Sequence, residues 1–269
     1  MSAAMNRTAL IAGEGSLVPA IAAALDAPLI YALDHLAPQV QARPFRLERL
    51  VPFLDELTDQ GVTQVVFAGA IRRPRIEPDL FDPRTMAIVP RILMGMQSGD
   101  DAALRAVLDV FEEAGIAIRS VDEILPDLVP GAGILTGQPS PRDEKDAARA
   151  VQIVQGLGQL DIGQGAVVAQ GLCLAVEALP GTQAMLEFVA LHAGLKPDPN
   201  GPGGVLYKAP KPGQDRRIDL PTIGPETVRQ AAAAGLAGIA WEAGSVILLD
   251  RALAIDCANQ AGLFLWARA

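Results

Sequence analysis

Side chains that bind soft metals or form disulfides are scarce in this sequence. Its 269 residues include two cysteines and two histidines, and neither cysteine lies in a Cys-x-x-Cys pair. This pattern excludes a zinc framework and a disulfide scaffold. We expect Cys173 to lie in the core and both His35 and His192 to be surface or capping residues. A bound metal would therefore take oxygen ligands, which favours Mg²⁺ or Mn²⁺ over zinc.

Long apolar runs are also absent, since no stretch approaches the roughly 18 residues that a transmembrane helix needs. The first residues lack a signal-peptide cleavage pattern and lead straight into an apolar segment. We therefore expect a cytosolic protein, and contact with a membrane surface stays open.

Aromatic residues and net positive charge are missing as well. Aromatics make up 4% of the chain, and the net charge of −9 argues against a general nucleic-acid binder. The basic residues nevertheless cluster at Arg72–Arg75 and Lys208–Arg217, which suits a small anionic ligand. Hydrophobic residues reach 50% and charged ones 20%, so the core must consist of Ala, Val, Ile and Leu. That mix is typical of parallel strands covered by Ala-rich helices.

The first half of the chain alternates short apolar runs with helical periodicity. The expected strands cover 9–12, 28–32, 63–68 and 116–120, and the expected helices end at Leu25 or cover 47–60, 90–97 and 100–114. This alternation predicts right-handed crossovers and an open parallel sheet. From residue 126 to 141 the composition changes to Pro, Gly, Ser and Thr without periodicity, which indicates a linker.

The second half reads differently because strands follow each other closely. Residues 165–177 predict two strands joined by a tight turn at Gln170-Gly171. Further strands are expected at 205–209, 238–243, 245–250 and 263–267, and helices at 182–193 and 225–234. We therefore expect an α/β fold with an N-terminal Rossmann-like parallel-sheet domain over residues 1–128. A linker at 129–142 joins it to a C-terminal mixed α/β catalytic domain at 143–269.

The segment from Tyr207 to Gly224 carries the strongest functional signal. It places two carboxylates, Asp215 and Asp219, among four cations, and three prolines prevent it from forming one long helix. Such a loop can hold a metal ion beside an anionic group such as phosphate. The alternative is a solvated loop with ordinary surface ion pairs.

Two glycine-containing turns in the first half follow predicted strands. Gly13-Glu-Gly-Ser-Leu17 opens a helix, a geometry in which backbone N–H groups bind phosphate. It lacks the third glycine of a dinucleotide fingerprint. Gly69-Ala-Ile-Arg-Arg73 follows another strand, so both turns should open on the same sheet edge. Arg72 and Arg73 can contact phosphate at that edge, and the alternatives for them are helix capping and loop solvation. Asp100 in Ser98-Gly-Asp-Asp101 has either a functional role or the role of an N-cap for the helix that follows.

These motifs together resemble one family. The resembling segments are Ala12-Gly-Glu-Gly-Ser-Leu17, Ala68-Gly-Ala-Ile-Arg-Arg-Pro74, Ser98-Gly-Asp-Asp101, Asp161-Ile-Gly-Gln164, Lys208–Gly224 and Ala234-Gly-Leu-Ala-Gly-Ile-Ala240. The chain resembles the LpxI-type UDP-2,3-diacylglucosamine pyrophosphatases of Gram-negative lipid A biosynthesis over nearly its whole length. The charged segment is the most specific of these motifs.

The resemblance implies metal-dependent hydrolysis of UDP-2,3-diacylglucosamine to UMP and 2,3-diacylglucosamine 1-phosphate (lipid X). It also implies two domains with the lipid held at their interface. The implied location is the cytoplasm, with transient contact at the inner-membrane surface, and a homodimer stays open.

Site residues follow from the motifs and the resemblance together. We expect Asp215 and Asp219 to hold Mg²⁺ (or Mn²⁺) or to orient water, with Lys208 as a third catalytic residue. The expected substrate contacts are Gly13, Gly15, Ser16, Leu17, Gly69, Ala70, Arg72, Arg73, Asp100, Gln164, Thr182, Lys211, Gln214 and Arg216.

One position departs from the family pattern. A Glu-Gly-Thr-Asp run is expected, but this chain has Pro180-Gly-Thr-Gln183. If that acid is a metal ligand, its role passes to Glu177 or another residue. Two other readings stay open: a noncatalytic UDP-sugar or lipid-binding module, and a nicotinamide-dependent oxidoreductase.

Overall fold

The structure is a computed structural model that describes residues 7–71, 76–98 and 100–269. Two compact units divide the chain, one ending at Pro126 and the other beginning at Asp127. An α/β chain with two such units confirms the expected fold class. Within the described ranges, no helix has the length and apolar character needed to cross a membrane.

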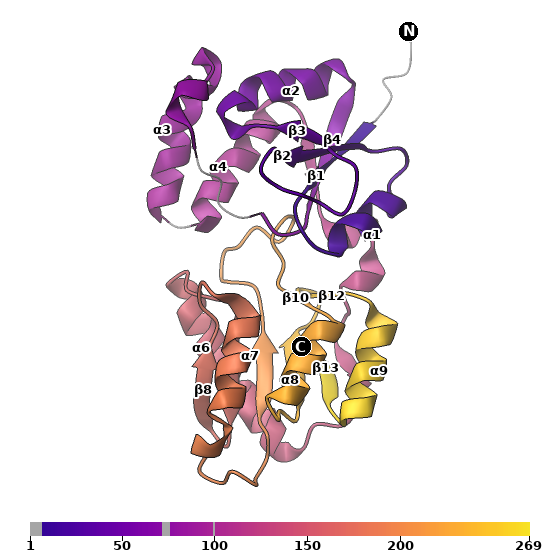
Figure 1. Cartoon of the computed structure of the whole chain (residues 1–269), viewed down its shortest axis with the longest axis vertical. Coiled ribbons are helices and arrows are strands. Elements are labelled where there is room, and N and C mark those ends of the chain that lie inside the picture. Colours follow the sequence, from indigo (N-terminus) through magenta and orange to yellow (C-terminus); the bar gives the residue numbers. More distant parts are fainter. Residues whose placement is uncertain (1–6, 72–75, 99) are drawn as a thin grey trace. The chain divides into compact units, whose positions relative to one another are not determined.

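Unit 1 is an α/β unit with a single sheet (Figure 1). Its elements are β1 (Arg7–Ala12), α1 (Leu17–Ala24), β2 (Leu29–Leu33), β3 (Arg43–Phe45), η1 (Leu47–Arg49), α2 (Leu50–Asp59), β4 (Val62–Ala68), η2 (Pro78–Leu80), α3 (Pro83–Ser98), α4 (Asp100–Glu113), β5 (Ala117–Arg119) and α5 (Val121–Ile124). The five strands are ordered β3-β2-β1-β4-β5, and every pair is parallel. This is the strand order of a Rossmann-type sheet, with its reversal between β1 and β4.

The helices of unit 1 divide between the two faces of this sheet. α1 and α5 contact each other and β4, whereas α2, α3 and α4 pack in sequence on the other side. Right-handed crossovers require this division, because the chain moves in opposite directions before and after β3. The core of unit 1 contains more aromatic residues than expected, with Phe111 edge-on to Phe67 and Phe53 at 5.4 and 6.4 Å.

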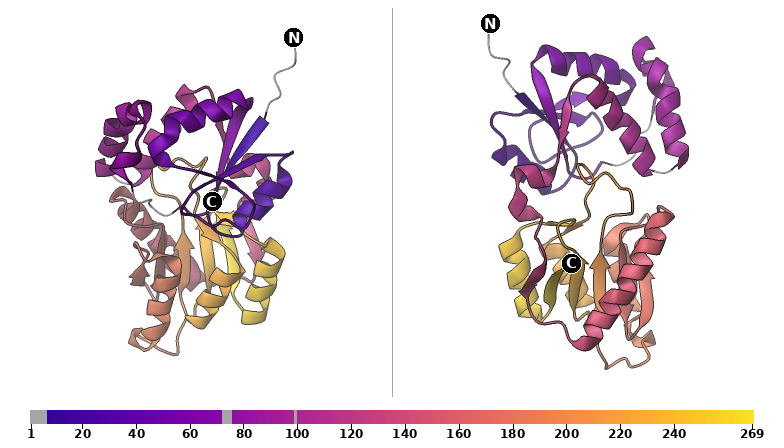
Figure 2. Two further views of the ribbon diagram at one scale, coloured as in Figure 1. Left: turned by 45° about the horizontal axis from the view of Figure 1, so that its top comes forward. Right: turned by 180° about the vertical axis from the view of Figure 1, so that it is seen from behind.

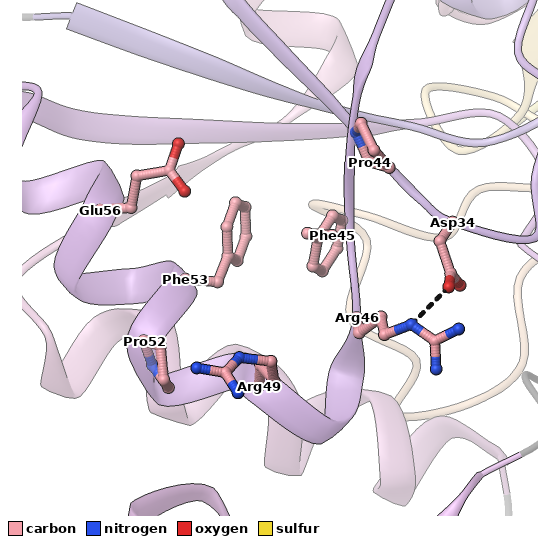
Figure 3. Close-up of a pocket in the computed structure, with 8 residues that line it drawn as sticks. All are labelled: Asp34, Pro44, Phe45, Arg46, Arg49, Pro52, Phe53 and Glu56. Carbon is pink, nitrogen blue, oxygen red and sulfur yellow. Dashed lines mark ion pairs between the residues drawn. The ribbon is translucent and has the colours of Figure 1, made fainter. Parts of the chain in front are cut away.

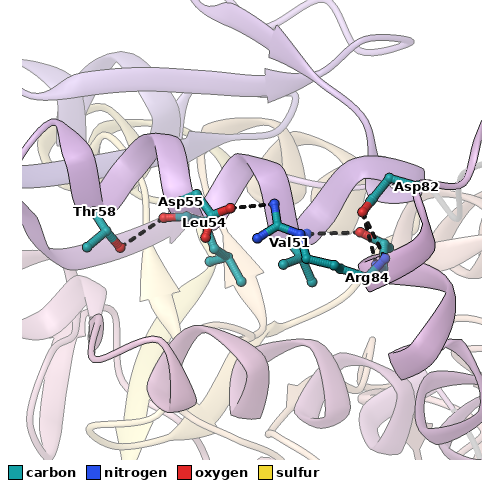
Figure 4. A network of polar contacts seen from close by, with 7 residues as sticks. Val51, Leu54, Asp55, Thr58, Asp82 and Arg84 are labelled. Atoms are coloured by element: carbon teal, nitrogen blue, oxygen red, sulfur yellow. Dashed lines mark hydrogen bonds and ion pairs between the residues drawn. The ribbon is translucent and has the colours of Figure 1, made fainter.

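Polar contacts tie the start of α3 to α2 (Figure 4). Asp82 accepts hydrogen bonds from the backbone N–H groups of Arg84 (3.0 Å) and Thr85 (3.3 Å) and so caps the helix. The Thr85 hydroxyl accepts from the backbone N–H of Val51 (3.0 Å), and Arg84 pairs with Asp55 (2.5 Å). Because Asp82 caps it, α3 begins at Pro83. This is two turns before Pro90, the residue at which periodicity predicted the helix to begin.

Unit 2 consists of a mixed sheet covered on both faces (Figures 1 and 2). Its elements are η3 (Pro126–Leu128, which begins on the last residue of unit 1), β6 (Gly133–Thr136), α6 (Pro141–Gln159), β7 (Gly165–Ala169), β8 (Leu172–Val176), α7 (Gly181–Leu191), η4 (Ala193–Leu195), β9 (Val205–Lys208), β10 (Thr222–Ile223), α8 (Pro225–Ala233), β11 (Gly238–Glu242), β12 (Ile247–Leu248), α9 (Arg251–Ala261) and β13 (Phe264–Arg268). The six-stranded sheet has the order β6-β13-β11-β9-β7-β8, and β10 pairs with β12 in a separate ribbon.

Strands β9, β11 and β13 are parallel, and β7, β8 and β6 add antiparallel pairs at either side. One face packs on α6, where Ala147, Ala150 and Val154 meet Val205 and Tyr207. The other face packs on α7, α8 and α9. Figure 2 shows α6 crossing the sheet in the view from behind.

Local polar groups explain two boundaries in unit 2. A capping box starts α6, because the Ser140 hydroxyl accepts from the Asp143 N–H and the Asp143 carboxylate accepts from the Ser140 N–H. The turn between β7 and β8 lies at Gln170-Gly171, as expected. The buried Asp146 carboxylate holds it by accepting from both backbone N–H groups, at 2.9 and 2.7 Å.

The structure differs from the sequence expectations at several places in unit 2. The segment 129–142, expected to be a linker, contains β6, which pairs with β13 and forms an edge of the sheet. Helix α9 was not expected. The residues of 245–250 contribute only the two-residue strand β12. Cys173 is exposed, so its expected place in the core was wrong, because β8 is the opposite edge strand.

Candidate functional site

The two glycine turns of unit 1 meet at the carboxyl edge of its sheet. Glu14 and Ala70 exchange backbone hydrogen bonds of 2.9 and 2.8 Å, so the turns after β1 and β4 form an isolated bridge. A Cβ on Gly13 would lie 2.6 Å from the Ala70 carbonyl oxygen, and one on Gly69 would lie 2.7 Å from that of Glu14. Glycine is therefore required for the backbones to approach this closely. The expectation that both turns share one edge is confirmed.

The other sequence-predicted residues of unit 1 lie around these turns. Ser16 precedes α1 and Leu17 is its first residue. Asp100 is the first residue of α4. Arg72 and Arg73 lie outside the described residues. Ligand contacts at these positions stay predictions.

In unit 2, several charged residues gather at the end of the sheet where β9 stops. Lys208 is the last residue of β9 and lies opposite Gly165, the first residue of β7. Glu177 follows β8, and its N–H donates to the Gly165 carbonyl at 2.8 Å. Thr182 lies in the first turn of α7. The antiparallel arrangement of β7 between β8 and β9 therefore brings three separate chain segments to one point.

Lys208, Glu177 and Thr182 form a triangle of polar contacts. The Lys208 Nζ lies 3.3 Å from Glu177 Oε2 and donates to the Thr182 hydroxyl at 2.7 Å. The Thr182 hydroxyl donates to Glu177 Oε2 at 3.1 Å. The Lys208 side chain is 5% exposed and that of Glu177 14%. A carboxylate and a hydroxyl thus accompany the Lys208 side chain where it is buried, as a buried basic group requires.

The first part of the charged loop is held by side-chain contacts to the backbone and to Asp161. Lys211 pairs with Asp161, and its backbone N–H donates to the Gln214 amide oxygen at 2.7 Å. The buried Gln214 side chain in turn donates to the Asp219 carboxylate. Gln214 therefore fixes the position of Asp219, which lies five residues further along the chain, relative to Lys211.

The second part of the loop contains two arginines with different partners. Arg217 donates to the Asp215 carboxylate with two nitrogens, Nε at 3.0 Å and Nη2 at 2.7 Å. Arg216 donates to the hydroxyl of the buried Ser245 at 2.8 Å and to Glu242 at 2.9 Å. The planar guanidinium groups thus orient the loop against its own carboxylate and against the end of β11.

Tyr207 precedes Lys208 and lies on the α6 side of the sheet. Burial raises the pKa of Tyr207 to about 12, and the charge of Glu242 acts in the same direction. The phenol therefore stays neutral at physiological pH.

Carboxylates of unit 2 are spread through this site rather than clustered. Among the residues that the structure describes, no group of three His, Cys, Asp or Glu side chains is arranged to hold a metal ion. The site thus offers Asp215 and Asp219 as separate oxygen donors, each already hydrogen-bonded within the loop.

The remaining expected residues and the departure from the family pattern can also be placed. The Gln164 carbonyl accepts from the N–H of Ala209, directly after Lys208. Gln183 lies on α7 and donates to Glu187 at 2.8 Å. Glu177, considered as a substitute acid, is committed to Lys208 and Thr182.

Three partners of the charged loop were missing from the sequence-based site. Asp161 belongs to a recognised motif, and that motif was the signal for it. Glu242 and Ser245 carry no local signal, because the register of β9 against β11 brings them to the loop.

The fold and site define a two-unit α/β protein, with a Rossmann-type sheet in unit 1 and a charged loop at a sheet edge in unit 2. The family model of the LpxI N-terminal domain matches residues 7–128, and that of the LpxI C-terminal domain matches residues 131–266. The chain is 37% identical over 283 aligned residues to "UDP-2,3-diacylglucosamine pyrophosphatase LpxI" of Caulobacter vibrioides. That alignment covers 97% of this chain and 96% of the relative. The chain belongs to the LpxI family.

Proposed function

We propose that this chain is an enzyme of lipid A biosynthesis that hydrolyses the diphosphate of UDP-2,3-diacylglucosamine to UMP and 2,3-diacylglucosamine 1-phosphate. The observation that carries the proposal is its 37% identity, over 97% of its length, to a pyrophosphatase named for that substrate. The charged loop supports it, because breaking a diphosphate requires cations that neutralise the phosphoryl oxygens and a positioned water.

The basic residues of the loop are assigned to the diphosphate. Lys208 has three N–H donors, and the contacts to Glu177 and Thr182 engage two of them. The third is assigned to a phosphoryl oxygen. Lys211 and Arg216 are placed by Asp161 and by Ser245, and both are assigned to the same charged group.

Asp215 and Asp219 are assigned to Mg²⁺ or Mn²⁺ and to the attacking water. Their carboxylates fit such an ion, since Mg²⁺ keeps several waters and uses one or two protein carboxylates together with substrate phosphates. When bound, the ion would stabilise negative charge on the phosphoryl oxygens. The chain's own contribution is orientation: Gln214 holds Asp219, and Arg217 holds Asp215.

The glycine turns of unit 1 are assigned to the nucleotide or sugar phosphate, because their backbone N–H groups lie at the carboxyl edge of a parallel sheet. We place the reaction in the cytoplasm, at the inner-membrane surface, because two acyl chains partition the substrate into lipid.

A noncatalytic UDP-sugar or lipid-binding module is the second candidate. It is favoured by a single observation, the glutamine at position 183 where the family pattern predicts an acid.

Incubation of the purified chain with UDP-2,3-diacylglucosamine and Mg²⁺, with and without EDTA, tests the proposal through release of UMP. We expect release that EDTA abolishes and added Mn²⁺ or Mg²⁺ restores. If EDTA left UMP release unchanged, the hydrolase activity would be supported and the proposed metal requirement would be wrong. Binding of the substrate without UMP would support the binding module.

A further inference from the structure

One side of unit 2 carries an exposed apolar surface on an edge strand and on the helix that follows it. β8 is the outermost strand of the six-stranded sheet, and α7 packs beside it (Figure 1). The exposed residues are Leu172 (52%) on β8, Phe188 (51%) and Leu191 (81%) on α7, and Leu195 (79%) on η4. We call these four residues, together with the free edge of β8, the β8–α7 surface.

Leu172 and α7 lie on the same side of the sheet. Leu172 pairs with Ala169, and Val167, two residues earlier on β7, packs into the core cluster that lies beneath α7. Because side chains alternate along a strand, Ala169 and Leu172 face α7 as well. α7 runs back along β8, and five strand residues and eleven helical residues both span about 16 Å. The last turn of α7 therefore lies beside Leu172.

α7 is apolar on its outer side as well as on its inner side. Met185, Leu186 and Val189 are buried against the sheet. Phe188 and Leu191, three residues apart, lie on the outer side and are exposed. A surface helix normally presents polar residues to water, whereas a helix that is apolar all round is normally buried. The outer side of α7 thus has the character of a contact surface.

The free edge of β8 is open to a further strand. No strand of the described residues pairs with the side of β8 that faces away from β7. Residues 162–176 include no charged residue and no proline. Edge strands in natural proteins usually carry such residues, which block pairing with another chain. The sequence of β8 therefore permits backbone hydrogen bonds to a strand from outside the chain.

The apolar hollow beside β3 in unit 1 has a different character. Figure 3 shows the stacked rings of Phe45 and Phe53 next to several charged side chains. Arg46 pairs there with Asp34 at 2.6 Å, and Glu56 also lines the hollow. Each chain carries a net charge of −9, so contact between two copies requires a surface with few charges. The β8–α7 surface meets this requirement, and the hollow does not.

A second copy of the chain fits the β8–α7 surface better than a lipid surface does. Residues 172–195 include no Lys or Arg, the residues by which an interfacial helix contacts anionic lipid. Lipid also offers no hydrogen-bond partners to the backbone of β8. A second β8 offers them, because a twofold axis perpendicular to the sheet places two copies of one strand antiparallel. The same axis brings the outer sides of both α7 helices together on one face.

We propose that two copies of this chain associate through the β8–α7 surface as a twofold-symmetric dimer. The two β8 strands pair and join both six-stranded sheets into one, and Phe188 and Leu191 of each copy pack against those of the other. Glu177 directly follows β8 and Thr182 lies in the first turn of α7, so association holds the two elements that carry the partners of Lys208. Self-association is independent of the reaction proposed above.

Sedimentation equilibrium of the full-length chain tests the dimer. We expect the wild type to have twice the mass of one chain at micromolar concentration. Leu172→Lys and Leu191→Lys each place like charges across the twofold axis and should raise the dissociation constant about 100-fold or more. The matched control is Leu253→Lys, the same change at a 48% exposed leucine on α9, and it should leave the mass unchanged.

Mixed variants test the geometry of the contact. Chains with Leu172→Lys and chains with Leu172→Glu should each be monomeric alone and should associate when mixed, because opposite charges then meet. Cys173 is exposed on β8 and gives a second measurement. A short bis-maleimide should link two otherwise unchanged chains, and Cys173→Ser should abolish the link whereas Cys257→Ser should not.

Three results would overturn the proposal. The first is a wild-type chain that stays monomeric at about 100 μM, whether or not it binds anionic phospholipid vesicles. The second is a dimer that both lysine variants leave intact, which would place the interface elsewhere. The third is a dimer that cannot be linked through Cys173. Thermal unfolding of the variants should match the wild type because both leucines are exposed, and if it does not, the link through Cys173 decides.

Discussion

Lys208 and Glu177 form a buried ion pair at the end of β9, with Lys208 Nζ 3.3 Å from Glu177 Oε2. Thr182 closes the contact from the first turn of α7. Together, Lys208, Glu177 and Thr182 therefore join the end of β9, the residue after β8 and the first turn of α7. The ion pair also places the Lys208 side chain at the end of β9, where the charged loop begins.

Glu177→Gln should be strongly destabilising, because it leaves Lys208 buried without a counter-charge. We expect a loss of about 3–5 kcal/mol in the free energy of unfolding, the usual result of breaking a buried pair. The double variant with Lys208→Met should recover part of it. Urea unfolding measures both. Glu187→Gln, an exposed change on α7, is the control and should stay within about 0.5 kcal/mol. Equal stabilities of Glu177→Gln and the control would contradict the pair's importance.

Asp215→Asn and Asp219→Asn should each reduce turnover while substrate binding is largely retained. The expected loss in kcat is about 100-fold or more, as for removal of a group that acts on the transition state. UMP release measures turnover, and binding of lipid X measures the retained affinity. Asp256→Asn, an exposed change on α9, serves as the matched control. A fully active double variant would remove both aspartates from the mechanism.

Gly13→Ala and Gly69→Ala should destabilise unit 1 because a Cβ at either position meets the backbone of the opposite turn, at 2.6 and 2.7 Å. Gly15→Ala is the comparison, since its φ of +106° is strained but nothing lies within 4 Å of the added Cβ. We expect about 1–3 kcal/mol from strain alone at Gly15 and a larger loss at Gly13. Thermal unfolding tests the order, and equal losses at the two positions would show that the turns separate easily.

Asp82→Ala should weaken the start of α3 by about 1 kcal/mol, the usual value of an N-cap. Burial alone would raise the pKa of Asp82, but hydrogen bonds from Thr85 and Arg84 lower it below its ordinary value of 3.8. A lowered native pKa means that the contribution is fully present above about pH 4 and disappears as the pH falls through the native pKa. The stability difference between wild type and Asp82→Ala should therefore shrink on acidification. A stability difference that does not change with pH would show that the charge of the Asp82 carboxylate does not contribute to the cap.

The two tyrosines should resist ionisation in the folded chain. Burial raises the pKa of Tyr31 above 10.0, with Glu56 contributing, and raises that of Tyr207 to about 12. Because both native values are raised, the stability involved is fully present below about pH 10 and is lost as the pH rises toward 12. Ultraviolet titration should find tyrosinate at lower pH in urea than in native protein. If tyrosinate formed over the same pH range in the native protein and in urea, both phenols would be exposed to water in the folded chain.

Local sequence patterns determined much of this molecule. The apolar runs predicted β1, β4, β9 and the turn between β7 and β8, because buried strands and turn residues are signalled within a few residues. The charged segment after β9 was visible for the same reason, since several Pro and Gly residues in a short stretch disfavour one continuous helix. The motifs spread along the chain also indicated its family.

Tertiary structure alone decided which residues meet. Strand β6 has no strong pattern of its own, and it becomes a strand because β13 offers it an edge. Cys173 follows an apolar pattern yet is exposed, because the position of β8 in the sheet order makes it an edge. Glu242 and Ser245 reach Arg216 through the pairing of β9 with β11. Contacts of this kind depend on sheet order and register, which long-range packing sets and which no short stretch of sequence contains.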